Sequence, residues 1–150
     1  MNSKTCFFIG SRHSSSAITE QLVEVIEKHI VEYGVTTFTV GHYGNFDSLV
    51  IGVLKEMKKK YTDIELYLLC PYALNQKRET PEGFDGTFYP DGLEFVPKPY
   101  AIVQANRYMI EHSDFLIANP GIGNSRKIVE YAQRREKKGL IKVTTLLQEP

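Results

Sequence analysis

The chain alternates between two patterns of apolar residues. Short apolar runs rich in β-branched and aromatic side chains predict buried strands at residues 5–9, 37–40, 65–69, 114–118 and 141–146. Between these runs, apolar residues recur every three or four positions, which predicts helices over about 17–32, 46–60, 100–112 and 126–138. Alternating strands and helices indicate an α/β fold with a mainly parallel sheet flanked by helices. Right-handed crossovers favour the strand order 3-2-1-4-5.

One long segment, residues 72–99, shows neither pattern. Loops of this length in compact domains are usually functional or contain small elements of their own. Aromatic side chains spread along the segment argue against disorder; among them are Phe84, Phe88, Tyr89 and Phe95. We expect the segment to form a lid over the edge where the strands end, or a contact in a homodimer.

Composition argues against several classes of protein. A length of 150 residues suits one domain, so residues 1–150 are expected to form a single unit. Lys+Arg and Asp+Glu number 18 each, and the resulting net charge of zero argues against a nucleic-acid partner. No apolar run approaches the roughly 18 residues of a membrane helix. The N-terminus leads into a predicted strand without a signal peptide, so we expect a cytoplasmic protein that does not bind membranes.

Three glycine-bearing loops follow the first, second and fourth predicted strands. The carboxyl ends of parallel strands share one edge of the sheet, and ligands bind there at the point where the strand order reverses. Helix N-termini at this edge favour anions, and an arginine guanidinium suits phosphate. The loop residues expected to contact a nucleotide or phosphate are Gly10, Ser11, Arg12, His13, Gly41, His42, Gly44, Asp47, Pro120, Gly121, Gly123, Asn124 and Ser125. Asn45 and Ser125 are expected to cap the helices after the second and fourth strands.

Other chemistry has less support in the sequence. His13 and His42 could converge, but no third metal ligand has an obvious position, so we expect no metal ion and no cofactor. Cys6 and Cys70 lack metal-binding spacing and fall near opposite edges of the predicted sheet, so no disulfide is expected. His29 lies on the apolar stripe of its helix, which predicts a packed core histidine.

Four blocks, in this order and spacing, resemble motifs of the SLOG superfamily. They are FIGSR at 8–12, GHYGNFD at 41–47, AIVQANRYM at 101–109 and SDFLI at 113–117. The first two resemble the group's Gly-Ser-Arg strand-turn and Gly-x-x-Gly-x-Asp turn, and the last two its Arg-Asn-x-x-Met helix and Ser-Asp-x-x-Ile strand. This Rossmann-like group includes Smf/DprA proteins, Lonely Guy phosphoribohydrolases and YpsA-like proteins. The resemblance, strongest to small YpsA-like or phage-type members, implies a bacterial or phage-encoded homodimer that binds nucleotides, and it adds Asn106 and Arg107 to the expected ligand contacts.

The chain departs from the Lonely Guy enzymes at one loop. Those enzymes carry P-G-G-x-G-T-x-x-E, whereas residues 120–130 read PGIGNSRKIVE. Glu130 comes about one helical turn late, and Lys127 stands near where an acid is wanted. The resemblance therefore supports nucleotide binding, by a sensor or sequestering module, more firmly than it supports catalysis.

Two alternative functions stay open. The chain could be an enzyme that cleaves or exchanges the N-glycosidic bond of a nucleotide, like Lonely Guy phosphoribohydrolases or nucleoside deoxyribosyltransferases, with Glu130 and Arg107 as catalytic residues. Single-stranded DNA binding, as in Smf/DprA proteins, is a third class, against which the zero net charge argues.

Each candidate residue also has a structural interpretation. Asp47 could cap a helix, while Arg107 and Glu130 could form surface pairs with Glu111 and Arg134.

Overall fold

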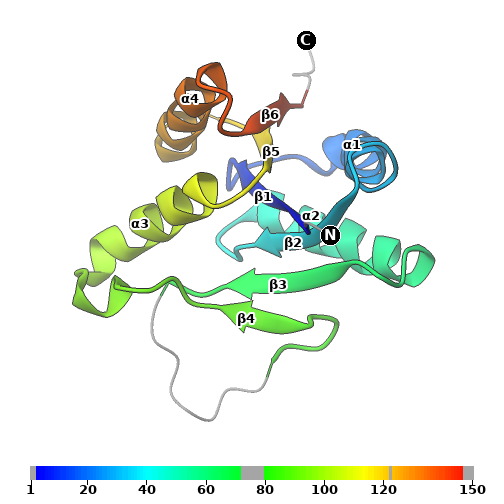
Figure 1. Ribbon diagram of the computed structural model, residues 1–150, viewed down its shortest axis with the longest axis horizontal. Helices are drawn as coiled ribbons and strands as arrows, with labels where there is room; N and C mark the ends of the chain where they lie inside the picture. The colour runs from blue at the N-terminus through cyan, green and yellow to red at the C-terminus, as the bar shows by residue number, and fades with distance from the viewer. Residues whose placement is uncertain (1–2, 72–79, 122, 147–150) are drawn as a thin grey trace.

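The computed structural model describes residues 3–71, 80–121 and 123–146 (Figure 1). Over these residues, six parallel strands form one sheet in the order β4-β3-β2-β1-β5-β6. The α/β fold, the parallel sheet and the relative order of the five predicted strands are confirmed. The strands are β1 (Lys4–Gly10), β2 (Val35–Val40), β3 (Glu65–Leu69), β4 (Gly86–Phe88), β5 (Phe115–Asn119) and β6 (Lys142–Thr145).

The strand β4 corrects the predicted count of five. It arises inside the segment 72–99, pairs with β3 and forms one edge of the sheet (Figure 1). Its three residues are too few to show the alternating pattern by which a strand is recognised. Its position depends on contacts made by Asp85, the residue just before it, and no local pattern predicts those contacts.

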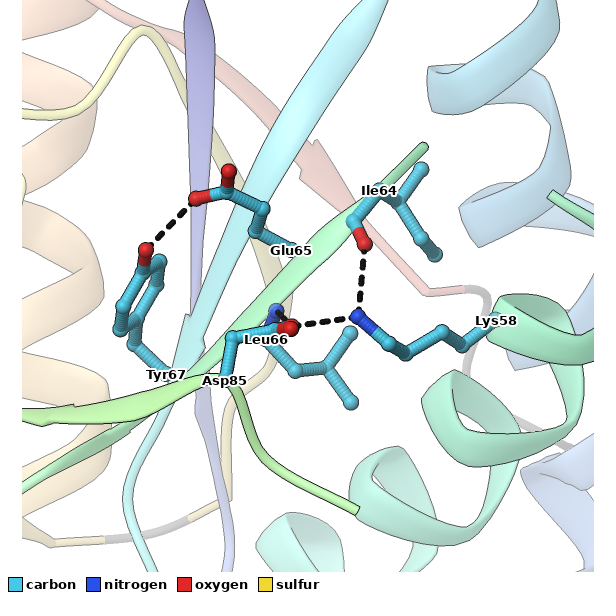
Figure 2. A network of polar contacts seen from close by, with 6 residues as sticks. All are labelled: Lys58, Ile64, Glu65, Leu66, Tyr67 and Asp85. Atoms are coloured by element: carbon cyan, nitrogen blue, oxygen red, sulfur yellow. Dashed lines mark hydrogen bonds and ion pairs between the residues drawn. The ribbon is translucent and has the colours of Figure 1, made fainter. Parts of the chain in front are cut away.

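Asp85 belongs to a polar network that joins α2 (Asn45–Lys60) to the edge of the sheet (Figure 2). Its carboxylate accepts a hydrogen bond from the Leu66 backbone N–H at 2.8 Å and pairs with Lys58 Nζ at 2.5 Å. Lys58 Nζ also donates to the Ile64 carbonyl at 3.0 Å. The network holds the residue before β4 against the start of β3, so it supports the pairing of these two strands.

Helices cover both faces of the sheet. The helices α1 (Thr19–Val31) and α2 pack on one face, and α3 (Lys98–Glu111) and α4 (Asn124–Lys137) pack on the other (Figure 1). Short 3₁₀ helices at Ser16–Ile18 and Leu93–Phe95 precede α1 and α3. Within the described ranges, no helix has the length and apolar character needed to cross a membrane.

The central strand β1 is apolar on both sides. Cys6 and Phe8 belong to the core beneath α1 and α2, and Phe7 and Ile9 belong to the core beneath α3 and α4. All four side chains are buried. A continuous apolar run is what a parallel strand covered on both faces requires. This packing places the loop after β1 in the middle of the carboxyl edge of the sheet.

The strand order reverses between β1 and β5. The chain leaves β1 through α1 toward β2, and it reaches β5 through α3 on the opposite face. Gly10 is in register with Asn119, and the Ser11 N–H donates to the Asn119 carbonyl at 3.0 Å. The loops after β1 and β5 therefore begin side by side, at the predicted switch point.

Two predicted helix caps are wrong. The N-cap of α2 is Gly44 and that of α4 is Gly123, so Asn45 and Ser125 lie one and two residues further on. Asn45 is the first residue of α2, and its N–H donates to the Arg12 carbonyl at 3.1 Å. At α2 the contact with the loop after β1 is distant in sequence, so no local pattern predicts where this helix begins.

The described part of the segment 72–99 places most of its aromatic residues against the core. Phe84 packs on the α1 and α2 side, and Phe88 and Tyr89 pack on the α3 and α4 side. Phe95 instead is 86% exposed. The predicted lid includes residues 72–79, which lie outside the described residues, and the homodimer contact stays a prediction.

Candidate functional site

A cavity of about 430 Å³ opens at the carboxyl edge of the sheet, at the switch point. Its volume falls within the roughly 300–1,000 Å³ of typical small-molecule sites. The lining comes from the end of β1, the loops after β1 and β2, the first turn of α2, and the helices α3 and α4. The cavity thus gathers elements from both faces of the sheet around the end of the central strand.

Many of the predicted ligand contacts line this cavity. Those present in the lining are Gly10, Ser11, Arg12, His13, Gly41, Gly44, Asp47, Asn106 and Ser125. Those absent from it are His42, Arg107, Pro120, Gly121 and Gly123. The side chain of Asn124 lies outside the described part of the structure. Among the described residues, the loops after β1 and β2 contribute more of the lining than the loop after β5.

A network of hydrogen bonds holds the loop after β1 in place. The Ser11 hydroxyl accepts from the His13 N–H at 3.1 Å, and the Ser14 hydroxyl donates to the Ser11 carbonyl at 2.7 Å. Asn119 Nδ2 donates to the Ser14 hydroxyl at 2.9 Å, which ties this loop to the end of β5. Sequence reasoning missed the roles of Ser14 and Asn119, because nothing local distinguishes them from other polar loop residues.

Close packing between loops explains two of the glycines. A Cβ atom at Gly44 would overlap Cα and Cβ of Arg12, and a Cβ at Gly10 would overlap the ring of Phe46. The group that each glycine approaches belongs to a neighbouring loop or helix, so these glycines shape the cavity by packing.

Arg12 is the cation of the site. Its backbone is fixed against Gly44 and by the hydrogen bond from the Asn45 N–H, while its side chain is exposed. Among the described residues, no carboxylate forms an ion pair with it. The guanidinium is therefore available to an anionic group of a ligand, and its planar fork of N–H donors matches phosphate.

Asp47 is the carboxylate of the site. It lies in the first turn of α2, is mostly buried, and accepts a hydrogen bond from the Tyr43 N–H to Oδ2 at 3.1 Å. Burial raises the pKa of Asp47 from 3.8 to about 6, although the hydrogen bond from Tyr43 acts in the opposite direction. Near neutral pH this side chain is therefore close to its change of charge.

An apolar wall completes the cavity on the other face of the sheet. It is formed by Pro99, Ile102 and Val103 of α3 and by Ile128 of α4, with Asn106 about one turn further along α3. Ile102 is one of the apolar residues whose spacing predicts this helix. Its place beside a polar loop could not be predicted, because it depends on how α3 crosses the sheet.

The two predicted catalytic residues lie away from the cavity lining. Arg107 Cζ is 4.9 Å from the ring centroid of Tyr131, a cation–π contact between α3 and α4. Glu130 is exposed and pairs with Arg126, with Nε and Oε1 3.3 Å apart. Each residue thus has a surface contact on the α3 and α4 side, although its partner is neither Glu111 nor Arg134.

The remaining ionisable residues of interest are packed into the core. His29 is fully buried, its Nδ1–H donates to the Val25 carbonyl at 2.7 Å, and burial lowers its pKa, which confirms the predicted core histidine. Cys6 and Cys70 are both buried, and no disulfide joins them. Over the described ranges, no group of three histidine, cysteine or acidic side chains is arranged to hold a metal ion.

The function must therefore be argued from the cavity itself. Its geometry joins an available guanidinium, a mostly buried carboxylate and an apolar wall at the switch point of a parallel sheet. No family model matches this chain, and no curated protein matches it.

Proposed function

We propose that this protein binds a nucleotide or a nucleotide-derived small molecule in the cavity at the switch point, as a sensor or sequestering module. The observation that carries the proposal is the convergence of Arg12, Asp47 and the apolar wall of α3 on one cavity of about 430 Å³. This is the position at which open α/β sheets bind their ligands. The combination of charged and apolar walls matches a ligand that has both an anionic group and a flat apolar ring.

Each part of such a ligand has a complementary surface. A phosphate would bind at the Arg12 guanidinium, close to the positive end of the α2 dipole beside Gly44. A base would lie against Ile102 and Val103, with Asn106 able to donate to and accept from its polar edge. These contacts use residues from both faces of the sheet, so the ligand would bridge α2 and α3.

The arrangement supports binding more directly than cleavage of a glycosidic bond. Glu130 is exposed, paired with Arg126 and absent from the cavity lining. An enzyme acting here would need Asp47 instead, because a carboxyl group with a pKa of about 6 can serve as a general acid near neutral pH. N-glycosidic cleavage is therefore kept as the second candidate function, with Asp47 in place of Glu130.

Calorimetric titration with nucleoside 5′-monophosphates tests the proposal. Arg12→Ala should weaken binding about 10- to 100-fold, the scale of a lost charge-assisted hydrogen bond. Arg134→Ala is the matched control, since Arg134 is an exposed arginine outside the cavity lining, and it should bind like wild type. Equal affinities for wild type and Arg12→Ala would contradict the proposal. Chromatography of the same mixtures reports any released base, which would favour the enzyme.

A further inference from the structure

Asp47 has an unusual environment for a carboxylate. It lines the cavity, and its described hydrogen bond is the one from the Tyr43 N–H to Oδ2. No lysine, arginine or histidine forms an ion pair with it in the described part of the chain. Buried acids are normally paired, because an uncompensated charge away from water costs stability.

An asparagine would be a less costly residue at this position. Its amide oxygen could accept the same hydrogen bond from Tyr43 without a charge to desolvate. The neighbouring Gly41 also leaves room for the carboxylate, since a Cβ there would lie 3.1 Å from Asp47 Oδ2. A carboxylate at position 47 therefore costs stability, although the space around it fits its shape. This combination indicates that the remaining lone pairs of Asp47 accept hydrogen bonds from a ligand.

That capacity suits a ligand with adjacent hydroxyl groups. An ionised carboxylate accepts hydrogen bonds only, through two oxygens with about four lone-pair sites. Oδ2 is engaged by Tyr43, and both oxygens keep lone pairs for donors in the cavity. The two hydroxyls of a ribose are neighbouring donors, whereas a deoxyribose presents one fewer.

We propose that Asp47 determines the sugar specificity of the site, accepting hydrogen bonds from the 2′- and 3′-hydroxyls of a ribose, so that the cavity selects ribonucleotides over 2′-deoxyribonucleotides. This inference rests on the proposed function and adds the class of ligand to it. Arg12 and Asp47 line the same cavity, so a sugar bound at Asp47 would place its phosphate toward Arg12.

The selectivity should depend on pH, because hydroxyl donors favour the ionised carboxylate. The other ionisable groups in the lining are Arg12 and His13 from the loop after β1 and Tyr43 from the loop after β2. The described lining residues of α3 and α4 carry no charge. The preference for ribonucleotides should therefore be largest above about pH 7 and shrink toward about pH 5, as Asp47 becomes protonated.

Calorimetric titration with matched ligand pairs tests the inference. The probes are the 5′-monophosphates of adenosine, guanosine, cytidine and uridine, each compared with its 2′-deoxy counterpart at about pH 5 and about pH 7.5. The ratio of the two affinities cancels the titration of the phosphate itself, whose second pKa is about 6. Wild type should prefer the ribonucleotide by about 10-fold or more at the higher pH, the scale of a hydrogen bond to a charged group.

Two variants with the same change of charge locate the effect. Asp47→Asn should bind the two nucleotides of each pair with affinities within about 2-fold of each other, at both pH values. Glu56→Gln removes an exposed carboxylate from the same helix, where it pairs with Lys59, and should keep the wild-type preference.

The outcomes distinguish this inference from the proposed function. Binding of ribo- and deoxyribonucleotides with equal affinity by wild type would overturn the inference and leave the proposed function standing. A preference that survives in Asp47→Asn would do the same. Failure of every nucleotide to bind wild type would overturn both. The comparison of ligand pairs on wild type needs no variant, so it holds even if Asp47→Asn folds poorly.

Discussion

His29 is a fully buried ionisable side chain and Asp47 is a half-buried one, and they lie at opposite ends of the sheet. His29 packs edge-on against Phe115, the first residue of β5, with ring centroids 5.4 Å apart. It also packs edge-on against Tyr33 at 5.0 Å. Asp47 follows the carboxyl end of β2 and lines the cavity. The two residues therefore allow a comparison between the environments of ionisable side chains at the two ends of one sheet.

The difference lies in the space around each side chain. His29 is enclosed by aromatic rings, and its Nδ1–H is satisfied by the carbonyl one turn earlier, so the neutral imidazole acts as a packing residue. Asp47 has a cavity beside it and spare capacity to accept hydrogen bonds. Burial alone does not mark a functional group. Burial next to an open cavity, without a compensating charge, is the informative combination.

The largest expected effect is the loss of packing at His29. His29→Ala should lower the free energy of unfolding by about 2–4 kcal/mol, because it removes a buried ring and leaves a cavity. His112 is a matched control, since its Nδ1 also lies 2.8 Å from the carbonyl four residues earlier, but it is exposed. His112→Ala should cost under about 1 kcal/mol. Urea denaturation of both variants measures the difference, and equal losses would remove the distinction drawn for His29.

The opposite sign is expected at the cavity. Asp47→Asn should raise the free energy of unfolding by about 1–3 kcal/mol at about pH 8. The rise in pKa from 3.8 to about 6 means that the ionised carboxylate is costly in the folded protein, whereas the amide keeps the hydrogen bond from Tyr43. Denaturant melts of wild type and variant provide the measurement. A destabilised variant would show that the carboxylate is a structural cap.

The two residues should also give opposite dependences on pH. The folded pKa of Asp47 is raised, so its cost to stability grows as pH rises from about 4 to about 6 and stays constant above that. The folded pKa of His29 is lowered, so its contribution is complete above about 6.5 and falls as pH drops below that value. Stability measured from about pH 4 to 8 for wild type and Asp47→Asn should diverge with rising pH. Parallel curves would rule out the shift at Asp47.

The smallest effect should come from Glu130. Glu130→Gln makes the same chemical change as Asp47→Asn, but on an exposed carboxylate whose partner is Arg126. Exposed ion pairs contribute little to stability, so the free energy of unfolding should change by under about 0.5 kcal/mol. The nucleotide affinity should stay within about 2-fold of wild type. Calorimetry and denaturation together test this. A large loss of binding or turnover would restore Glu130 as a site residue.

The sequence alone determined the general plan of the molecule, because that plan depends on local patterns. The alternation of apolar periods predicts the α/β fold, and the handedness of crossovers then predicts the order β3-β2-β1-β5-β6. Glycine-bearing strand ends such as Gly10 and Gly41 indicate the edge at which the cavity lies. The stripe position of His29 likewise predicts its burial.

Only the tertiary structure decided which polar residues matter, because their environments depend on segments far apart in the chain. The sequence places Asp47 in the first turn of its helix and Glu130 about one turn later in its own, but it does not show which of the two carboxylates lies beside a cavity. Packing of the loop after β1 against Gly44 leaves Asp47 inside the cavity, while Glu130 reaches solvent and Arg126. In the same way, the contacts of Asp85 with Leu66 and Lys58, which are distant from it in sequence, hold the start of β4 beside β3. Long-range contacts of this kind leave no periodic trace in the sequence, and for that reason they appear only in the folded chain.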